Sequence, residues 1–171
     1  AQRFFHLIVL PNVRLNIRDS PNKKLNPHLF NALKKSLFKP AAFFRGILLP
    51  LAEGQVVVAV CLFCDVFFVG GDCTLREAAV VGAALAKMTV PAIHASAALL
   101  KLCKITHYNG PTSLFIRVLL NKKYALAFRV VDALVNHFLS FASEERPLPV
   151  LWHQALLSFV QVSKQRFHFV A

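Results

Sequence analysis

The sequence predicts an all-α fold in which antiparallel helical hairpins follow one another in a HEAT-like helical array. Three observations support this fold class. Apolar residues recur at helical spacing along most of the chain, and prolines or capping residues mark where successive helices begin. The connections between the helices are short, so neighbouring helices should pack antiparallel. With 171 residues, 56% of them hydrophobic, the chain is long enough to form one domain with a core.

The first predicted helices open at a proline or a capping residue. Asn26 and Pro27 provide a cap and a first-turn proline, and Pro40 opens a second helix in the same way. Thr74 and Glu77 have the spacing of a capping box, in which each side chain bonds the backbone N–H of the other residue. We therefore expect helices over about 27–38, 40–51 and 75–88.

The later helices are marked in the same manner. Pro91 precedes one apolar segment and Pro111 opens the next. An apolar stripe then runs from Tyr124 to Phe138 with polar residues outside it. The last expected helix follows a proline-containing loop and contains Trp152. The sequence thus predicts helices over 92–102, 111–120 and 124–138, and around position 152.

Residues 56–69 interrupt the helical pattern. They read VVVAVCLFCDVFFV, an apolar run with a single charge that is too short to span a bilayer, which takes about 20 residues. Exposed between helices, such a run favours aggregation. Our hypothesis is that residues 54–69 and the tail 162–171 are translated intron, because Val69-Gly70 can be encoded by a splice-acceptor sequence and Val162-Ser163 by a splice-donor sequence. A buried insert at 54–69 is the alternative, since loops accept insertions readily.

The charge of the chain is strongly basic. It has 20 Lys and Arg residues against 8 Asp and Glu residues, a formal net charge of +12. The excess lies in residues 1–52 and beyond residue 75, whereas residues 53–75 carry acids only. A field of this sign attracts polyanions such as nucleic acid. We therefore predict an RNA-rich partner, with a basic solubilising surface as the alternative.

Basic side chains at predicted helix ends and turns are the candidates for contacting RNA. Lysine binds phosphate as a point charge, and arginine adds bidentate contacts. Phe43 and Phe44 belong to an apolar face and should be core residues, so we expect the protein to bind RNA backbone and shape, not base sequence. The candidate RNA-binding residues are Lys23, Lys24, Lys34, Lys35, Lys39, Arg45, Lys122, Lys123 and Arg129.

The sequence offers no constellation of catalytic or metal-ligating residues. Cys61-x-x-Cys64 resembles half of a zinc site, but Cys73 and Cys103 are too far apart in sequence to form the other half. His28, His137 and His153 lie singly in predicted helices, and the histidines are interpreted as core or surface residues. We therefore predict that the protein is not an enzyme and takes no metal, cofactor or small-molecule substrate. Four cysteines in a chain of this length favour a reducing compartment.

Five stretches of the sequence resemble the bystin family. They read LFNALKKSLFKPAAFFRGILLPL (29–51), CTLREA (73–78), PAIHASAALLKL (91–102), NKKYALAFRVVDALVNHFL (121–139) and LPVLWHQALLSFVQ (148–161). The resemblance covers residues 2–161 in one order. It implies a bystin-like helical domain over 1–161 with an aberrant apolar insert at 54–69, followed by a non-family tail at 162–171.

The resemblance also implies a function. Members of the family are all-helical factors in ribosome biogenesis, acting in maturation of the small-subunit (18S) rRNA. The implied partners are pre-rRNA in the small-subunit precursor particle, together with ribosomal proteins and assembly factors of the subunit head. The implied location is the nucleus and nucleolus, with passage to the cytoplasm. No catalytic residue is implied, and the basic residues within the matched motifs inherit a contact role alone.

Two other functions stay open beside RNA binding. One is a helical adaptor that binds peptides or partner helices in its grooves, with its basic charge incidental. The other is a peripheral membrane or adhesion-complex protein attracted to acidic lipid. Under the RNA-binding hypothesis we expect no membrane partner. Neither has a specific RNA role, so binding to rRNA fragments, compared with binding to acidic and neutral vesicles, separates the three.

Overall fold

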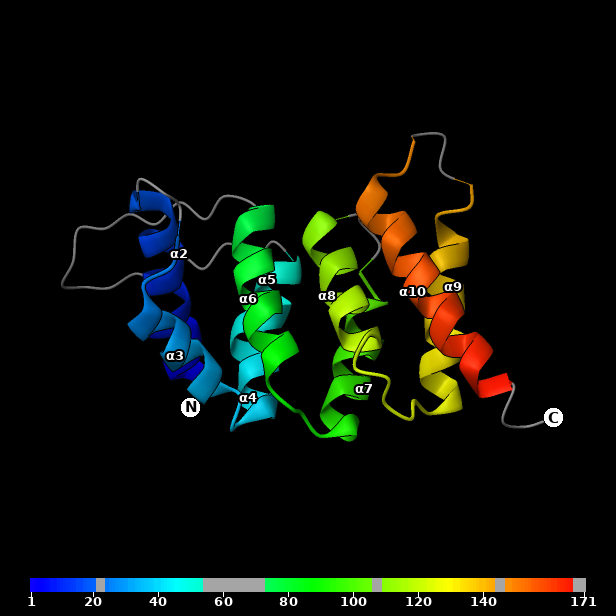
Figure 1. The fold of residues 1–171 in the computed structure, drawn as a ribbon, viewed down its shortest axis with the longest axis horizontal. Helices are drawn as coiled ribbons and strands as arrows, with labels where there is room; N and C mark the ends of the chain where they lie inside the picture. The colour runs from blue at the N-terminus through cyan, green and yellow to red at the C-terminus, as the bar shows by residue number, and fades with distance from the viewer. Residues whose placement is uncertain (21–23, 54–72, 106–108, 144–146, 168–171) are drawn as a thin grey trace. The chain divides into compact units, whose positions relative to one another are not determined.

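The computed structural model describes residues 1–20, 24–53, 73–105, 109–143 and 147–167, with side chains placed up to residue 163. Over these residues the regular structure is helical, without a β-strand (Figure 1). The predicted all-α class is therefore confirmed. The chain divides into two compact units, Ala1–Met88 and Thr89–Ala171, called unit 1 and unit 2 below. The HEAT-like array stays a prediction, and the apolar insert at 54–69 lies outside the described residues.

Unit 1 begins with a helix that the sequence did not predict, running without a break from Gln2 to Asp19. Three helical segments form it in succession: α1 (Gln2–Phe4), η1 (Phe5–Val9) and α2 (Leu10–Asp19). The predicted helices then follow close to the expected bounds. They are α3 (Pro27–Ser36), a second composite helix made of α4 (Pro40–Phe43), η2 (Phe44–Leu48) and α5 (Leu49–Glu53), and α6 (Leu75–Lys87).

Both π-helical turns, η1 and η2, precede a proline. η1 ends two residues before Pro11, and η2 ends two residues before Pro50. A proline within a helix lacks an N–H, and its ring presses on the carbonyl four residues earlier, so a wider turn relieves the clash. For Pro50 that carbonyl belongs to Gly46, and His6 Nδ1 lies 3.2 Å from its oxygen. His6 of the first helix thus contacts the Gly46 carbonyl, which cannot accept the usual helical hydrogen bond because residue 50 is proline.

The two composite helices approach so closely that glycine is required at position 46. A Cβ atom on Gly46 would lie 2.9 Å from the backbone oxygen of Gln2 and 3.2 Å from Cβ of Phe5. The absence of a side chain therefore lets the two backbones touch. Around this crossing the core of unit 1 is apolar, with fully buried side chains at Leu33, Phe43, Ile47, Leu48 and Leu85.

Unit 2 follows the predicted order of helices with one shifted start. Its helices are α7 (Ala92–Leu102), α8 (Gly110–Leu120), α9 (Phe128–Ser140) and α10 (Val150–Phe167). The apolar stripe predicted to be helical from Tyr124 becomes helical only at Phe128. Lys123 has a φ of 54°, in the left-handed region, which turns the chain away from a helix. The hydroxyl of Tyr124 accepts a hydrogen bond from the N–H of Val90 at 3.0 Å, so Tyr124 fastens this turn to the segment before α7.

Aromatic side chains join the last two helices of unit 2. The ring of Phe138 on α9 lies 5.7 Å from that of Trp152 and 5.5 Å from that of Phe159, both on α10. The neighbouring His137 is 7% exposed, and its Nδ1 lies 3.3 Å from the carbonyl oxygen of Cys103 at the end of α7. Burial lowers the pKa of His137 and so favours the neutral imidazole. His137 is therefore a core residue that connects α9 to α7.

Candidate nucleic-acid interface

Three of the five described RNA-binding candidates of unit 1 lie at or just after the carboxyl end of α3. Lys34 and Lys35 occupy its last turn, and Lys39 flanks the start of α4. Lys35 and Lys39 are exposed, and Lys34 is half-buried. The negative end of a helix dipole favours cations at this place. The structure does not bring the remaining two to this turn, because Lys24 is exposed ahead of the amino end of α3 and Arg45 is exposed in η2.

The predicted residues of unit 2 lie around the turn between α8 and α9. Lys123 is exposed at the left-handed position, and Arg129 is exposed in the first turn of α9. Lys122 is half-buried, and burial lowers the pKa of its ammonium group. A partly dehydrated ammonium has less water to lose when it meets a phosphate. Lys23, the ninth candidate, lies outside the described residues.

Most of these cations have no acidic partner. A cation that is already paired with a carboxylate gains little from a new anion. Cations without an ion-pair partner are therefore the ones available to an anionic ligand. Over the described parts of the chain, no ion pair forms at Lys24, Lys34, Lys35, Lys39, Arg45, Lys123 or Arg129.

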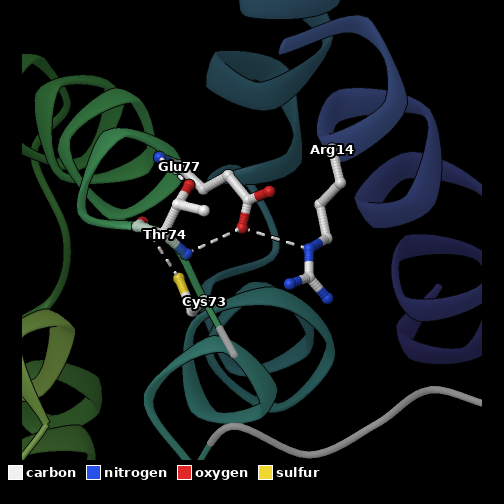
Figure 2. Close-up of polar contacts among 4 residues, drawn as sticks. All are labelled: Arg14, Cys73, Thr74 and Glu77. Atoms are coloured by element: carbon white, nitrogen blue, oxygen red, sulfur yellow. Dashed lines mark hydrogen bonds and ion pairs between the residues drawn. The ribbon is translucent and has the colours of Figure 1, made fainter. Parts of the chain in front are cut away.

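Arg14 differs from these cations, because it is buried and forms an ion pair within unit 1. Its Nε donates to Oε2 of Glu77 at 3.1 Å, and the two side chains are 7% and 4% exposed (Figure 2). The same Oε2 accepts from the N–H of Thr74 at 3.3 Å, while the N–H of Glu77 donates to Oγ1 of Thr74 at 3.3 Å. The predicted capping box is therefore confirmed. Figure 2 shows the guanidinium of Arg14 reaching this helix start from the first helix of unit 1.

An open pocket of about 580 Å³ lies beside this ion pair in unit 1. Its described lining consists of Ile17, Arg18, Thr74, Arg76 and Glu77. The hydroxyl of Thr74 and the carboxylate of Glu77 are both engaged in the capping box, so neither is placed as a nucleophile or a general base. The pocket adds two arginines to the basic character of unit 1 without assembling a catalytic group.

The thiols and other potential metal ligands do not form a reactive centre in the described ranges. Burial raises the pKa of Cys73 and of Cys103 to about 12, so both thiols stay protonated at neutral pH and are poor nucleophiles. No group of three His, Cys, Asp or Glu side chains converges there as a metal site would need. Cys61 and Cys64 lie outside the described residues. The same ranges contain no helix with the length and apolarity that a membrane crossing requires.

One basic residue near the predicted set was missed by the sequence analysis. Lys87, the last residue of α6, is exposed, and its Nζ lies 5.5 Å from the ring centroid of Phe30 on α3. Lys34 lies over the same ring at 5.4 Å. The available signal was its place in the last turn of the Ala-rich helix, where a cation suits the dipole. Its nearness to Lys34 depends on how α6 packs against α3, which no local pattern shows.

Comparison with known proteins identifies the family. The family model described as Bystin matches residues 1–168. The chain belongs to the bystin family. Bystin of Dictyostelium discoideum is 54% identical to it over 161 residues, which are 94% of this chain and 30% of that relative. Bystin of Drosophila melanogaster is 52% identical and bystin of Homo sapiens 51% identical over 161 residues, again 94% of this chain, and 33% and 32% of those relatives.

The match to bystins confirms the family that the five sequence stretches indicated. The chain spans about a third of the length of the curated bystins it matches. The basic turn after α3 and the turn between α8 and α9 both lie within the region matched by the family model.

Proposed function

We propose that this bystin-family chain is a non-enzymatic ribosome biogenesis factor that binds pre-rRNA and assembly partners during small-subunit (18S) rRNA maturation. The observation that carries the proposal is a set of exposed cations that form no ion pair within the described residues, Lys35 and Lys39 near the carboxyl end of α3 and Lys123 and Arg129 near the start of α9. Cations of this kind neutralise phosphates and release the counterions condensed on RNA. A net charge of +12 supplies the long-range attraction.

The proposed contacts are mainly to the RNA backbone. Phe38, between Lys35 and Lys39, is 76% exposed and can stack one base, but such stacking tolerates any base, and the two aromatic residues that follow Lys39 are buried. Phe43 is 0% exposed and Phe44 is 4% exposed, and their rings pack edge to face at 5.8 Å. A base needs an exposed aromatic face to stack on. The affinity should therefore depend on charge and on RNA shape far more than on base sequence.

We propose the partners and the location that the family resemblance implies. They are the small-subunit precursor particle with its ribosomal proteins and the assembly factors of the subunit head, in the nucleus and nucleolus with passage to the cytoplasm. Because the chain spans about a third of its relatives, contacts made by the rest of those proteins lie beyond this proposal. The proposal includes no small-molecule substrate and no membrane partner.

The test compares binding of the full chain to small-subunit rRNA fragments, unrelated RNA of equal length, acidic vesicles and neutral vesicles at several salt concentrations. The logarithm of RNA affinity should fall linearly with the logarithm of salt, by roughly 0.7 to 0.9 per phosphate neutralised. Binding to RNA should exceed binding to acidic vesicles of similar charge density. Salt-insensitive RNA binding, or stronger binding to acidic vesicles, would contradict the proposal.

A second candidate function is a helical protein–protein adaptor. The observation in its favour is a set of apolar side chains left exposed on α9 and α10 of unit 2. An amphipathic partner helix could cover such side chains, as in helix-in-groove recognition. Capture of a defined partner helix by the chain, without measurable RNA binding, would favour this function. The exposed apolar residues are Phe128, Val135, Leu139, Val150, Leu157 and Val160.

A further inference from the structure

Two lysines from different helices of unit 1 lie over one aromatic ring. Nζ of Lys34 is 5.4 Å and Nζ of Lys87 is 5.5 Å from the ring centroid of Phe30. Lys34 and Phe30 are one turn apart on α3, whereas Lys87 ends α6, which packs against α3. Phe30 and Lys34 are half-buried, and Lys87 is exposed. The ring therefore collects two cations at the place where the two helices meet.

This arrangement brings two like charges together, with no ion-pair partner for either among the described residues. Because each Nζ lies within 5.5 Å of the same point, the two ammonium groups are at most about 11 Å apart and repel each other. Neither lysine forms an ion pair within the described part of the chain. The attraction of each cation to the ring offsets the repulsion and restricts two flexible side chains. An anion bound between them would remove the repulsion and meet donors that are already in place.

We propose that Lys34 and Lys87, positioned by Phe30, form a binding site for the phosphodiester backbone of RNA. The site rests on the proposed function and adds Lys87 and Phe30 to the predicted contact residues. Lys35 lies beside Lys34 on the last turn of α3 and is exposed. Three cations, two at the end of α3 and one at the end of α6, suit a chain of successive phosphates better than a single anion. Lysine is a point-charge phosphate binder that needs no bidentate geometry.

The first experiment removes both charges from the full chain. In Lys34→Gln/Lys87→Gln, affinity for single-stranded RNA should fall by roughly fivefold for each lost phosphate contact, and the salt slope should fall by about 0.7 for each. The matched control is Lys101→Gln/Lys104→Gln, which removes two exposed lysines of unit 2 from the end of α7 and the turn after it. The control should lower the slope much less than the test variant.

The second experiment asks whether the ring positions the lysines. Phe30→Leu keeps an apolar side chain between the helices but removes the aromatic face. It should lower RNA affinity by about fivefold, because binding must then order two lysine side chains that the ring had positioned, each worth roughly twofold or more. In the Lys34→Gln/Lys87→Gln background the same substitution should change RNA affinity no further. A ring with a purely structural role would instead change affinity equally in both backgrounds, through stability, which urea unfolding of each variant reports.

Failure of the site and failure of the proposed function look different. If the wild-type chain binds RNA with a steep salt slope and Lys34→Gln/Lys87→Gln keeps that slope, this site is wrong and the proposed function stands. If the wild-type chain does not bind RNA, both are wrong. A polyglutamate peptide serves as the competing polyanion. If it binds more tightly than RNA and loses its binding in the same variant, the site belongs to an acidic protein segment and the RNA assignment is overturned.

Discussion

Replacing Glu77 by Gln removes one charge from the buried ion pair of unit 1 while keeping the size of the side chain. The guanidinium of Arg14 is 3.1 Å from Oε2 of Glu77, and the two side chains are 7% and 4% exposed. In Glu77→Gln the Arg14 charge stays buried without its carboxylate. Breaking such a pair by removing one partner costs about 3 to 5 kcal/mol. A whole domain is stable by about 5 to 15 kcal/mol, so the loss is a large fraction of the total.

The capping box must be separated from the ion pair in this measurement. Gln at the third helical position can still accept from the N–H of Thr74, so Glu77→Gln retains much of the cap. Thr74→Ala removes the other half of the capping box and leaves the ion pair; it should cost about 1 kcal/mol. Arg14→Met/Glu77→Gln removes both buried charges and should regain most of the stability lost in Glu77→Gln, because the guanidinium is no longer buried without its carboxylate.

Urea unfolding followed by circular dichroism gives the free energy of unfolding of these variants. The expected order of stability is wild type, Thr74→Ala, the double variant at a similar level, and Glu77→Gln last. If Glu77→Gln were no less stable than Thr74→Ala, water would be reaching the guanidinium and the burial argument would be refuted. A double variant as unstable as Glu77→Gln would show that the loss comes from packing or from the cap, not from an unpaired charge.

Three further predictions concern other features of the chain. Gly46→Ala should destabilise unit 1 by about 1 to 3 kcal/mol, since its Cβ would lie 2.9 Å from a backbone oxygen; an unchanged melting temperature would contradict the close crossing. The buried His137 has a lowered pKa, so the unfolded chain takes up a proton first. Its contribution to stability should be full above its ordinary pKa of 6.5 and should decline as the pH falls below it. Urea midpoints measured across this range should fall less in His137→Gln. A variant lacking residues 54–69 should be more soluble than the full chain, and a mature transcript that still encodes VVVAVCLFCDVFFV would refute the intron interpretation.

The elements that the sequence predicted correctly depend on neighbouring residues. Asn26 accepts a hydrogen bond from the N–H of His28 at the start of α3, and Thr74 and Glu77 close their capping box, because a cap is decided within one turn. The helix over residues 2–19 could not be predicted in this way. Pro11 within it indicates a break, and what keeps the helix continuous is the preceding π turn. The late start of α9 depends in turn on the bond from Val90 to Tyr124, 34 residues away in sequence.

The same distinction applies to the candidate interface. The exposure of Lys35, Lys39 and Lys123 follows from their places at helix ends and turns, which the sequence marks directly. The sequence could not show that Arg14 is buried in an ion pair instead of being exposed to a ligand, because its partner Glu77 is 63 residues away. Nor could it show that Lys87 joins Lys34, since that meeting depends on the packing of α6 against α3.

The π turn η1 acts as a one-residue insertion in the first helix. It therefore sets which side chains of the following segment, α2, face the core. An inserted residue rotates the following helix by about 100°, the angle of one step in a helix of 3.6 residues per turn. Beyond η1 the inward face carries Val13, Arg14 and Ile17. Deleting a single residue from η1 would restore a regular helix and swing Arg14 away from Glu77. The phase of the helix, set at residues 5–9, is thus a condition for an ion pair formed with a residue beyond position 70.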